Sequence, residues 1–117
     1  MSEVPDFTES ELELIHQTLN KRFEKDVEEQ LADVEIRLSP ADRALTVCPA
    51  VFWSERGANF VLVKSGEKEF RCQFYYREQE QFGTGRDTYD ELGDCVVNLL
   101  RVQADHERDR HLNQAGN

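Results

Sequence analysis

The segment Phe70-Arg71-Cys72-Gln73-Phe74-Tyr75-Tyr76-Arg77 decides the fold of this chain, because its side chains alternate in character with a period of two. Successive side chains of a β-strand point to opposite faces of the sheet. The residues of one face are Phe70, Cys72, Phe74 and Tyr76, and those of the other are Arg71, Gln73, Tyr75 and Arg77. The pattern predicts a strand with one face in the core and a more polar face open to other contacts.

Three further strands are predicted before this one, over residues 34–38, 45–53 and 60–63. The first alternates apolar and charged side chains, and the third is apolar on both faces, as in a central strand. Short turn sequences rich in Ser, Gly and Pro separate the strands, which predicts an antiparallel meander. Pro49 cannot donate a ladder hydrogen bond, so we expect an edge or a bulge at that position.

Apolar side chains recur every three or four residues on both sides of the strands, which predicts two amphipathic helices. The first is expected over residues 9–31, where Thr8 and Glu11 can form a capping box. The second is expected to begin near Thr88, where Thr88 and Glu91 can form another. Residues 78–87 between strand and helix are polar and predict a loop.

These elements predict an α+β fold. It is a two-layer sandwich in which N- and C-terminal helices cover one face of a four-stranded antiparallel meander, in the order α-β-β-β-β-α. The 117 residues suffice for one domain, which we assign to residues 1–111. The polar stretch 112–117 predicts a disordered tail.

Composition narrows the classes of partner. The net charge of −10 argues against a nucleic-acid partner, whose phosphates would be repelled. No stretch has the length of a membrane span or the pattern of a signal peptide, so we expect a cytoplasmic protein without a membrane partner. The three cysteines, Cys48, Cys72 and Cys95, lack metal or redox spacing and predict buried structural thiols.

The sheet face turned away from the helices is the first candidate site. It would present Phe52, Arg71, Gln73, Tyr75 and Arg77, with either Phe60 and Leu62 or Val61 and Val63. Aromatic residues and arginine are enriched at protein interfaces. Residues 39–77 also carry a net charge of +2, against −7 for residues 1–38 and −5 for residues 78–117. An acidic surface, either of a partner protein or of a second copy, could dock there.

This surface predicts a small acidic binding or adaptor module. The size, acidity and order of elements resemble bacterial secretion chaperones in outline, without the strand-helix-strand middle of that family. An acidic immunity or antitoxin protein, which neutralises a basic target, belongs to the same class of function.

The second candidate site is Gly83-Thr84-Gly85-Arg86, which precedes a predicted helix and could hold an anion with backbone N–H groups. The segment lacks the lysine of a P-loop, and Asp87, Asp90, Glu91 and Asp94 beside it repel phosphate. The alternative function is therefore a small-ligand or enzymatic domain with its site near residues 82–94.

The sequence favours a protein that is not an enzyme and uses no cofactor. No nucleophile motif is present. His16, His106 and His111 have no sequence neighbour that would make one of them a catalytic base, and the five-residue spacing of the last two is poor for a shared metal on a helix. We therefore predict neither catalytic nor metal-binding residues.

Overall fold

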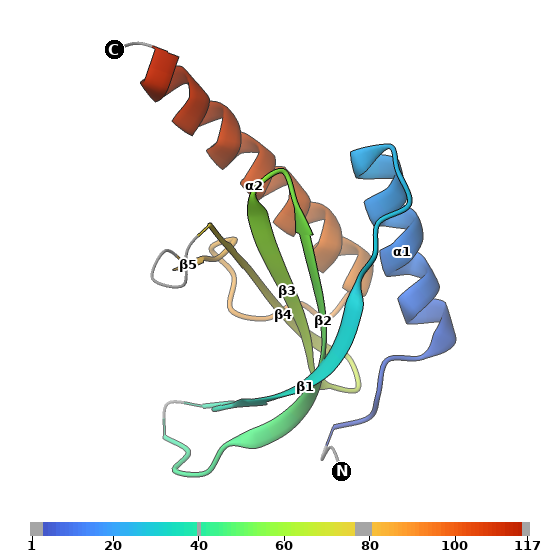
Figure 1. Ribbon diagram of the computed structural model, residues 1–117. Helices are drawn as coiled ribbons and strands as arrows, with labels where there is room; N and C mark the ends of the chain where they lie inside the picture. Colours follow the sequence, from blue (N-terminus) through green and yellow to red (C-terminus); the bar gives the residue numbers. More distant parts are fainter. Residues whose placement is uncertain (1–3, 40, 77–80, 116–117) are drawn as a thin grey trace.

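The computed structural model of the protein describes residues 4–39, 41–76 and 81–115, with side chains as far as residue 109. Its elements, in chain order, are α1 (Glu9–Phe23), β1 (Gln30–Ile36), β2 (Thr46–Glu55), β3 (Ala58–Gly66), β4 (Glu69–Tyr75), β5 (Gln81–Phe82) and α2 (Leu92–Ala115) (Figure 1). The strands form one antiparallel sheet in the order β1-β2-β3-β4-β5. The predicted α+β fold is confirmed, with one short strand more than the four predicted.

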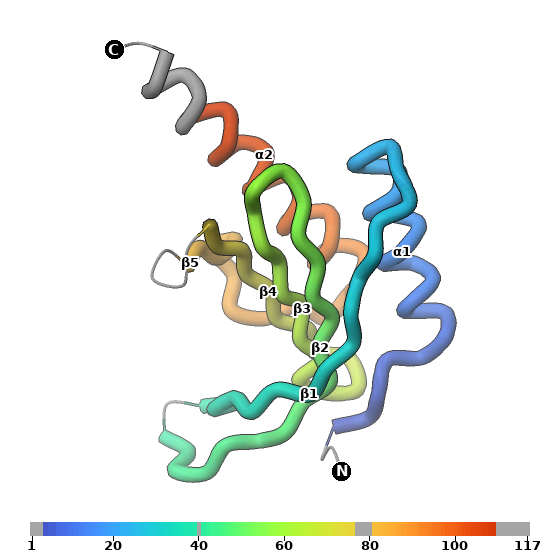
Figure 2. The backbone as a smooth tube through the Cα atoms, in the orientation of Figure 1, coloured from blue at the N-terminus to red at the C-terminus, as the bar shows by residue number. Residues whose placement is uncertain are grey.

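Both helices lie on the same side of the sheet, as the backbone trace shows (Figure 2). The apolar face predicted for residues 70–77 points toward them, and Phe74 is completely buried there. Its ring stacks on Phe82 of β5, with 5.4 Å between ring centroids. The main core also contains Ile15 and Leu19 of α1 and Leu99 of α2. The predicted facing of this strand is therefore correct.

The predicted end of the first helix is wrong. Helix α1 begins with the predicted Thr8–Glu11 capping box but stops at Phe23, where Glu24 adopts a left-handed conformation with φ 56°. The chain then folds back, because the side-chain oxygen of Asn20 accepts a hydrogen bond of 2.8 Å from the backbone N–H of Val27. Leu31, which continues the helical spacing, lies instead in β1 and is 62% exposed.

The predicted start of the second helix is also wrong. The backbone N–H and C=O groups of Tyr89 pair with those of Phe70 in two hydrogen bonds of 2.8 Å, so residue 89 is held against β4. Helix α2 therefore starts only at Leu92, and the predicted capping box of Thr88 and Glu91 does not begin it. The helix continues to Ala115, through part of the predicted tail. Neither of the two described helices has the length and apolar composition to cross a membrane.

Strands β1 and β2 extend beyond the rest of the sheet. Strand β2 pairs with β1 from Thr46 to Phe52 but with β3 only from Ala50 onward. Pro49 thus lies where β2 has no β3 partner, a position that tolerates a residue without a backbone donor. We call residues 33–36 and 46–49 the β1–β2 arm; Figure 1 shows it sweeping away from β3 and β4.

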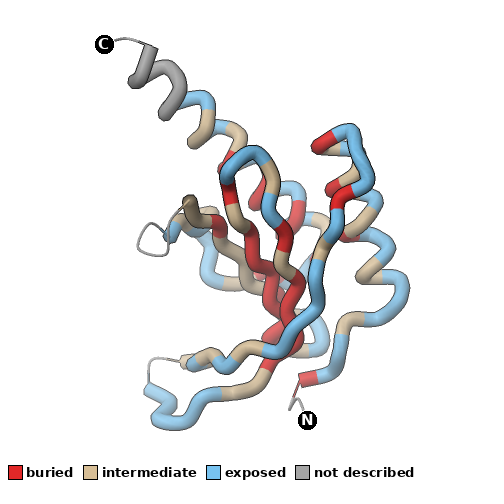
Figure 3. The backbone as a smooth tube through the Cα atoms, viewed as in Figure 1, coloured by how far each residue is buried: buried red, intermediate tan, exposed pale blue. Residues whose placement is uncertain are grey.

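A second, smaller core lies on the sheet face opposite the helices. Its buried members are Val4, Cys48, Ala50, Val61 and Val63, and partly buried residues packed against them include Val34, Ile36, Leu38 and Phe52. Figure 3 shows that the buried residues concentrate in the central strands, whereas much of β1 is exposed. The curved sheet therefore buries apolar side chains on both of its faces.

Candidate partner-binding groove

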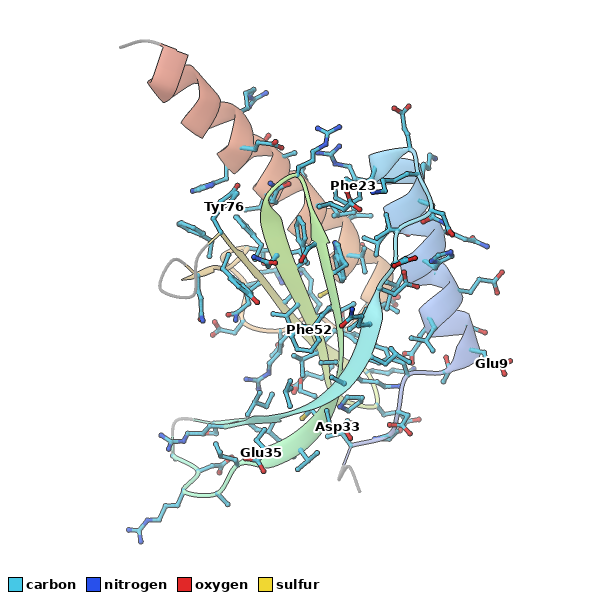
Figure 4. The ribbon with its side chains drawn as sticks, viewed as in Figure 1. Glu9, Phe23, Asp33, Glu35, Phe52 and Tyr76 are labelled. Carbon is cyan, nitrogen blue, oxygen red and sulfur yellow. The ribbon has the colours of Figure 1, made fainter. Side chains whose placement is uncertain are left out.

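A groove with a volume of about 540 Å³ lies on the sheet face opposite the helices. Its lining residues are Val34, Ile36, Phe52, Val61, Val63, Arg71, Cys72, Gln73, Tyr75 and Gln81. Strands β1, β2 and β3 supply apolar side chains, whereas β4 and β5 supply mostly polar ones. The groove thus has an apolar part and a polar wall. Figure 4 places the labelled side chain of Phe52 in the middle of the sheet.

Strand register explains why these side chains meet. Phe52 of β2 pairs with Val61 of β3, which in turn pairs with Gln73 of β4. Cross-strand partners point to the same face of a sheet, so the three side chains form one row across it. The neighbouring row runs through Val63 and Arg71 in the same way.

The structure brings four predicted partner-binding residues together. Phe52, Arg71, Gln73 and Tyr75 all line the groove, and Arg77 lies outside the described residues. Of the two pairs left open on the third strand, Val61 and Val63 are the ones on this face.

Sequence reasoning missed four lining residues: Val34 and Ile36 of the arm, Gln81 of β5, and Cys72 of β4, which the alternation assigned to the opposite face. The alternation in residues 34–38 shows that β1 has an apolar face. It carries no signal that the arm brings this face to the groove.

Arg71 holds one end of the groove together. Its Nη2 donates a hydrogen bond of 2.8 Å to the carbonyl oxygen of Leu38, which follows β1, and its Nε donates one of 3.2 Å to Ser65 Oγ. The same Ser65 hydroxyl donates to a carboxylate oxygen of Glu69 at 2.7 Å, and that oxygen is 3.7 Å from Arg71 Nη2. Arg71 thus ties β4 to the end of the arm, and Glu69 partly balances its charge.

The predicted anion-binding residues lie elsewhere. Gly83, Thr84, Gly85 and Arg86 precede α2, and none of them lines the groove. The Arg86 guanidinium lies over the ring of Tyr89, 4.4 Å from its centroid, and Thr84 is hydrogen-bonded to the Tyr89 hydroxyl. Two side chains of this loop therefore contact the same tyrosine.

Among the residues that the structure describes, His16 and Cys95 have shifted pKa values. The carboxylate of Glu29 accepts a hydrogen bond from His16 Nδ1 at 2.9 Å and, together with Asp26 at 3.1 Å from Nε2, raises the pKa of His16. A hydrogen bond with Cys72, together with burial, raises the pKa of the Cys95 thiol and keeps it protonated. Cys48 and Cys95 are buried free thiols, and Cys72 is half-buried.

Across the part of the chain that the structure describes, no three His, Cys, Asp or Glu side chains are grouped so that they could hold a metal ion. Comparison of the chain with known protein families, curated proteins and solved structures found no match.

Proposed function

We propose that this protein is a binding module whose groove accepts an apolar segment of a partner protein. The observation that carries the proposal is the continuity of apolar side chains from β1 through β3 beside the polar wall of β4. Phe52 and Tyr75 are only half-buried there, so both rings can bury more surface on binding. Tyrosine and arginine, which Tyr75 and Arg71 supply to the groove, are among the residue types enriched at interface hot spots.

A second candidate is a small ligand with an apolar body and a polar end. The groove volume of about 540 Å³ supports it, because small-molecule sites span roughly 300–1,000 Å³ and combine apolar walls with a few polar groups. Both candidates use the same residues, so a test of the groove must separate a peptide from a small molecule.

Selection of peptides from a random displayed library against the immobilised protein tests the proposal. We expect enrichment of peptides with closely spaced apolar residues. Their binding should be lost in Gln73→Trp, because the indole ring fills the groove. It should be kept in Ser10→Trp, which adds the same ring at an exposed position of α1. Circular dichroism and thermal unfolding of each variant confirm that the fold is intact.

The selection also decides between the candidates. Failure to enrich any peptide, or equal binding to both tryptophan variants, would show that the groove does not bind protein segments. A shift in melting temperature by a metabolite in the wild type, absent in Gln73→Trp, would then favour the small ligand. Self-association that Gln73→Trp abolishes would identify a second copy as the partner.

A further inference from the structure

Strand β1 is an open edge of the sheet within the described residues, because β2 is its neighbour on one side and no described strand flanks the other. The unpaired N–H and C=O groups of an edge strand can pair with an incoming extended segment. Val34 and Ile36 of this strand already line the groove. A strand added beside β1 would therefore place alternate side chains along the lip of the groove.

The other face of β1 is acidic. Asp33 and Glu35 are exposed there, and neither forms an ion pair with another described residue. Figure 4 labels both along the arm. Side chains on the matching face of an added strand would lie next to these two carboxylates.

A hollow of about 400 Å³ adjoins this edge and combines apolar walls with two carboxylates. Its lining residues are Asp6, Phe7, Leu12, Leu31, Ala32, Asp33, Pro49 and Ala50. A lysine or arginine side chain suits such a space, because its aliphatic part packs on apolar groups while its cation reaches the acids.

We propose that the segment bound by the groove is an extended strand that pairs with β1. Its apolar side chains face the groove, and its lysines or arginines lie beside Asp33, Glu35 and the hollow. This inference rests on the proposed function and specifies the chemistry of the partner. The net charge of −10 also draws a basic segment toward the protein over long range.

A second copy of this chain is a poorer occupant of the edge. If the β1 strands of two copies paired in antiparallel fashion about Asp33, the two Asp33 carboxylates would face each other. The Glu35 carboxylate of each copy would lie close to this pair. Like charges that face each other across strands are destabilising. The acidic edge therefore disfavours self-pairing and favours a basic partner.

Fluorescence anisotropy with nine-residue peptides of alternating Lys and Val tests the inference. We expect the wild type to bind this peptide and to bind the matching Glu–Val peptide at least about tenfold more weakly. The double change Asp33→Lys, Glu35→Lys should weaken Lys–Val binding at least about tenfold. Asp87→Lys, Asp90→Lys makes the same charge change at exposed loop positions and should weaken it much less.

Backbone methylation separates strand pairing from simple charge attraction. Peptides N-methylated either on every Lys or on every Val lose the N–H groups of one strand edge while keeping their charge. Pairing with β1 predicts that one methylated series loses at least about tenfold in affinity and the other much less. Equal affinities of the two series, or equal effects of the two Lys double variants, would overturn the inference.

Failure of this inference and failure of the proposed function remain distinguishable. If library peptides bind, lose affinity in Gln73→Trp and bind equally well to Asp33→Lys, Glu35→Lys, the groove function stands and recognition of a basic strand by β1 is refuted. A stable dimer in sedimentation that dissociates in the Asp33→Lys, Glu35→Lys variant would instead identify a second copy at the edge and overturn the inference.

Discussion

Single buried side chains determine how firmly the sheet is held to the helices, and Phe74 is the central one. Its ring is completely buried and contacts the rings of Phe60, Phe82 and His106. We predict that Phe74→Ala lowers the free energy of unfolding by about 3–5 kcal/mol, because the change removes buried surface and leaves a cavity. Urea denaturation measures this loss, and a value below about 1 kcal/mol would mean that the ring is not in the core.

Lys64 is a buried cation that the sequence pattern does not reveal. Its side chain is 3% exposed, and Nζ lies 2.7 Å from Glu11 Oε1 and 3.1 Å from the carbonyl oxygen of Asp6. It therefore joins β3 to the start of α1. We predict that Lys64→Met costs about 2–4 kcal/mol of unfolding free energy, since Glu11 loses its buried partner but stays partly solvated.

A matched control for Lys64 is Lys68→Met, which makes the same change at an exposed turn position. Denaturation should show a change within about 0.5 kcal/mol for this variant. Equal effects of the two substitutions would contradict a structural role for the Lys64–Glu11 pair.

At the scale of elements, His16 links α1 to the segment that follows it. Glu29 and Asp26 flank the ring and raise its pKa in the folded state. The charged form of His16 therefore contributes fully to stability below about pH 6.5, the pKa of histidine in the unfolded chain. This contribution is lost as the pH rises through the higher pKa of His16 in the folded protein.

We predict that the stability difference between the wild type and His16→Gln is largest near pH 6 and shrinks toward pH 9. Chemical denaturation of both proteins across this range measures it. A difference that stays constant or grows with pH would show that the histidine is not stabilised in its charged form.

The β1–β2 arm depends on Arg71 for its position. We predict that Arg71→Met speeds amide hydrogen exchange in residues 33–38 by at least about tenfold, because the arm loses a charged hydrogen bond to Leu38. Arg43→Met, at an exposed position in the segment that joins the two strands of the arm, should leave exchange there unchanged. Unchanged exchange in both variants would show that other contacts hold the arm.

The sequence predicts elements better than their ends. Alternation in residues 70–77 is enough to assign both faces of β4, and the Thr8–Glu11 capping box is formed as predicted. The end of α1 and the start of α2 are set instead by tertiary contacts, namely the Asn20–Val27 hydrogen bond and the pairing of Tyr89 with Phe70. Strand β5 has only two residues, too few to show a period.

At the scale of the whole molecule, the groove results from sheet curvature. Side-chain alternation placed Phe52, Arg71, Gln73 and Tyr75 on one face, and the structure brings all four to the groove. The curvature itself could not be predicted, because it depends on where β2 leaves β3 and on a contact between Arg71 and Leu38, 33 residues apart. Such long-range contacts leave no periodic signal in a single sequence.

The central claim is that the groove on the sheet face opposite the helices binds a protein segment. An NMR titration of the ¹⁵N-labelled protein with the strongest library-selected peptide tests it most directly. We predict that the largest amide shift changes fall in the strands that line the groove, at 33–36 of β1, around Val61 and within 71–75, with small changes in α1 and α2. Changes concentrated on the helices or on residues 83–86, with β3 and β4 unaffected, would contradict the claim.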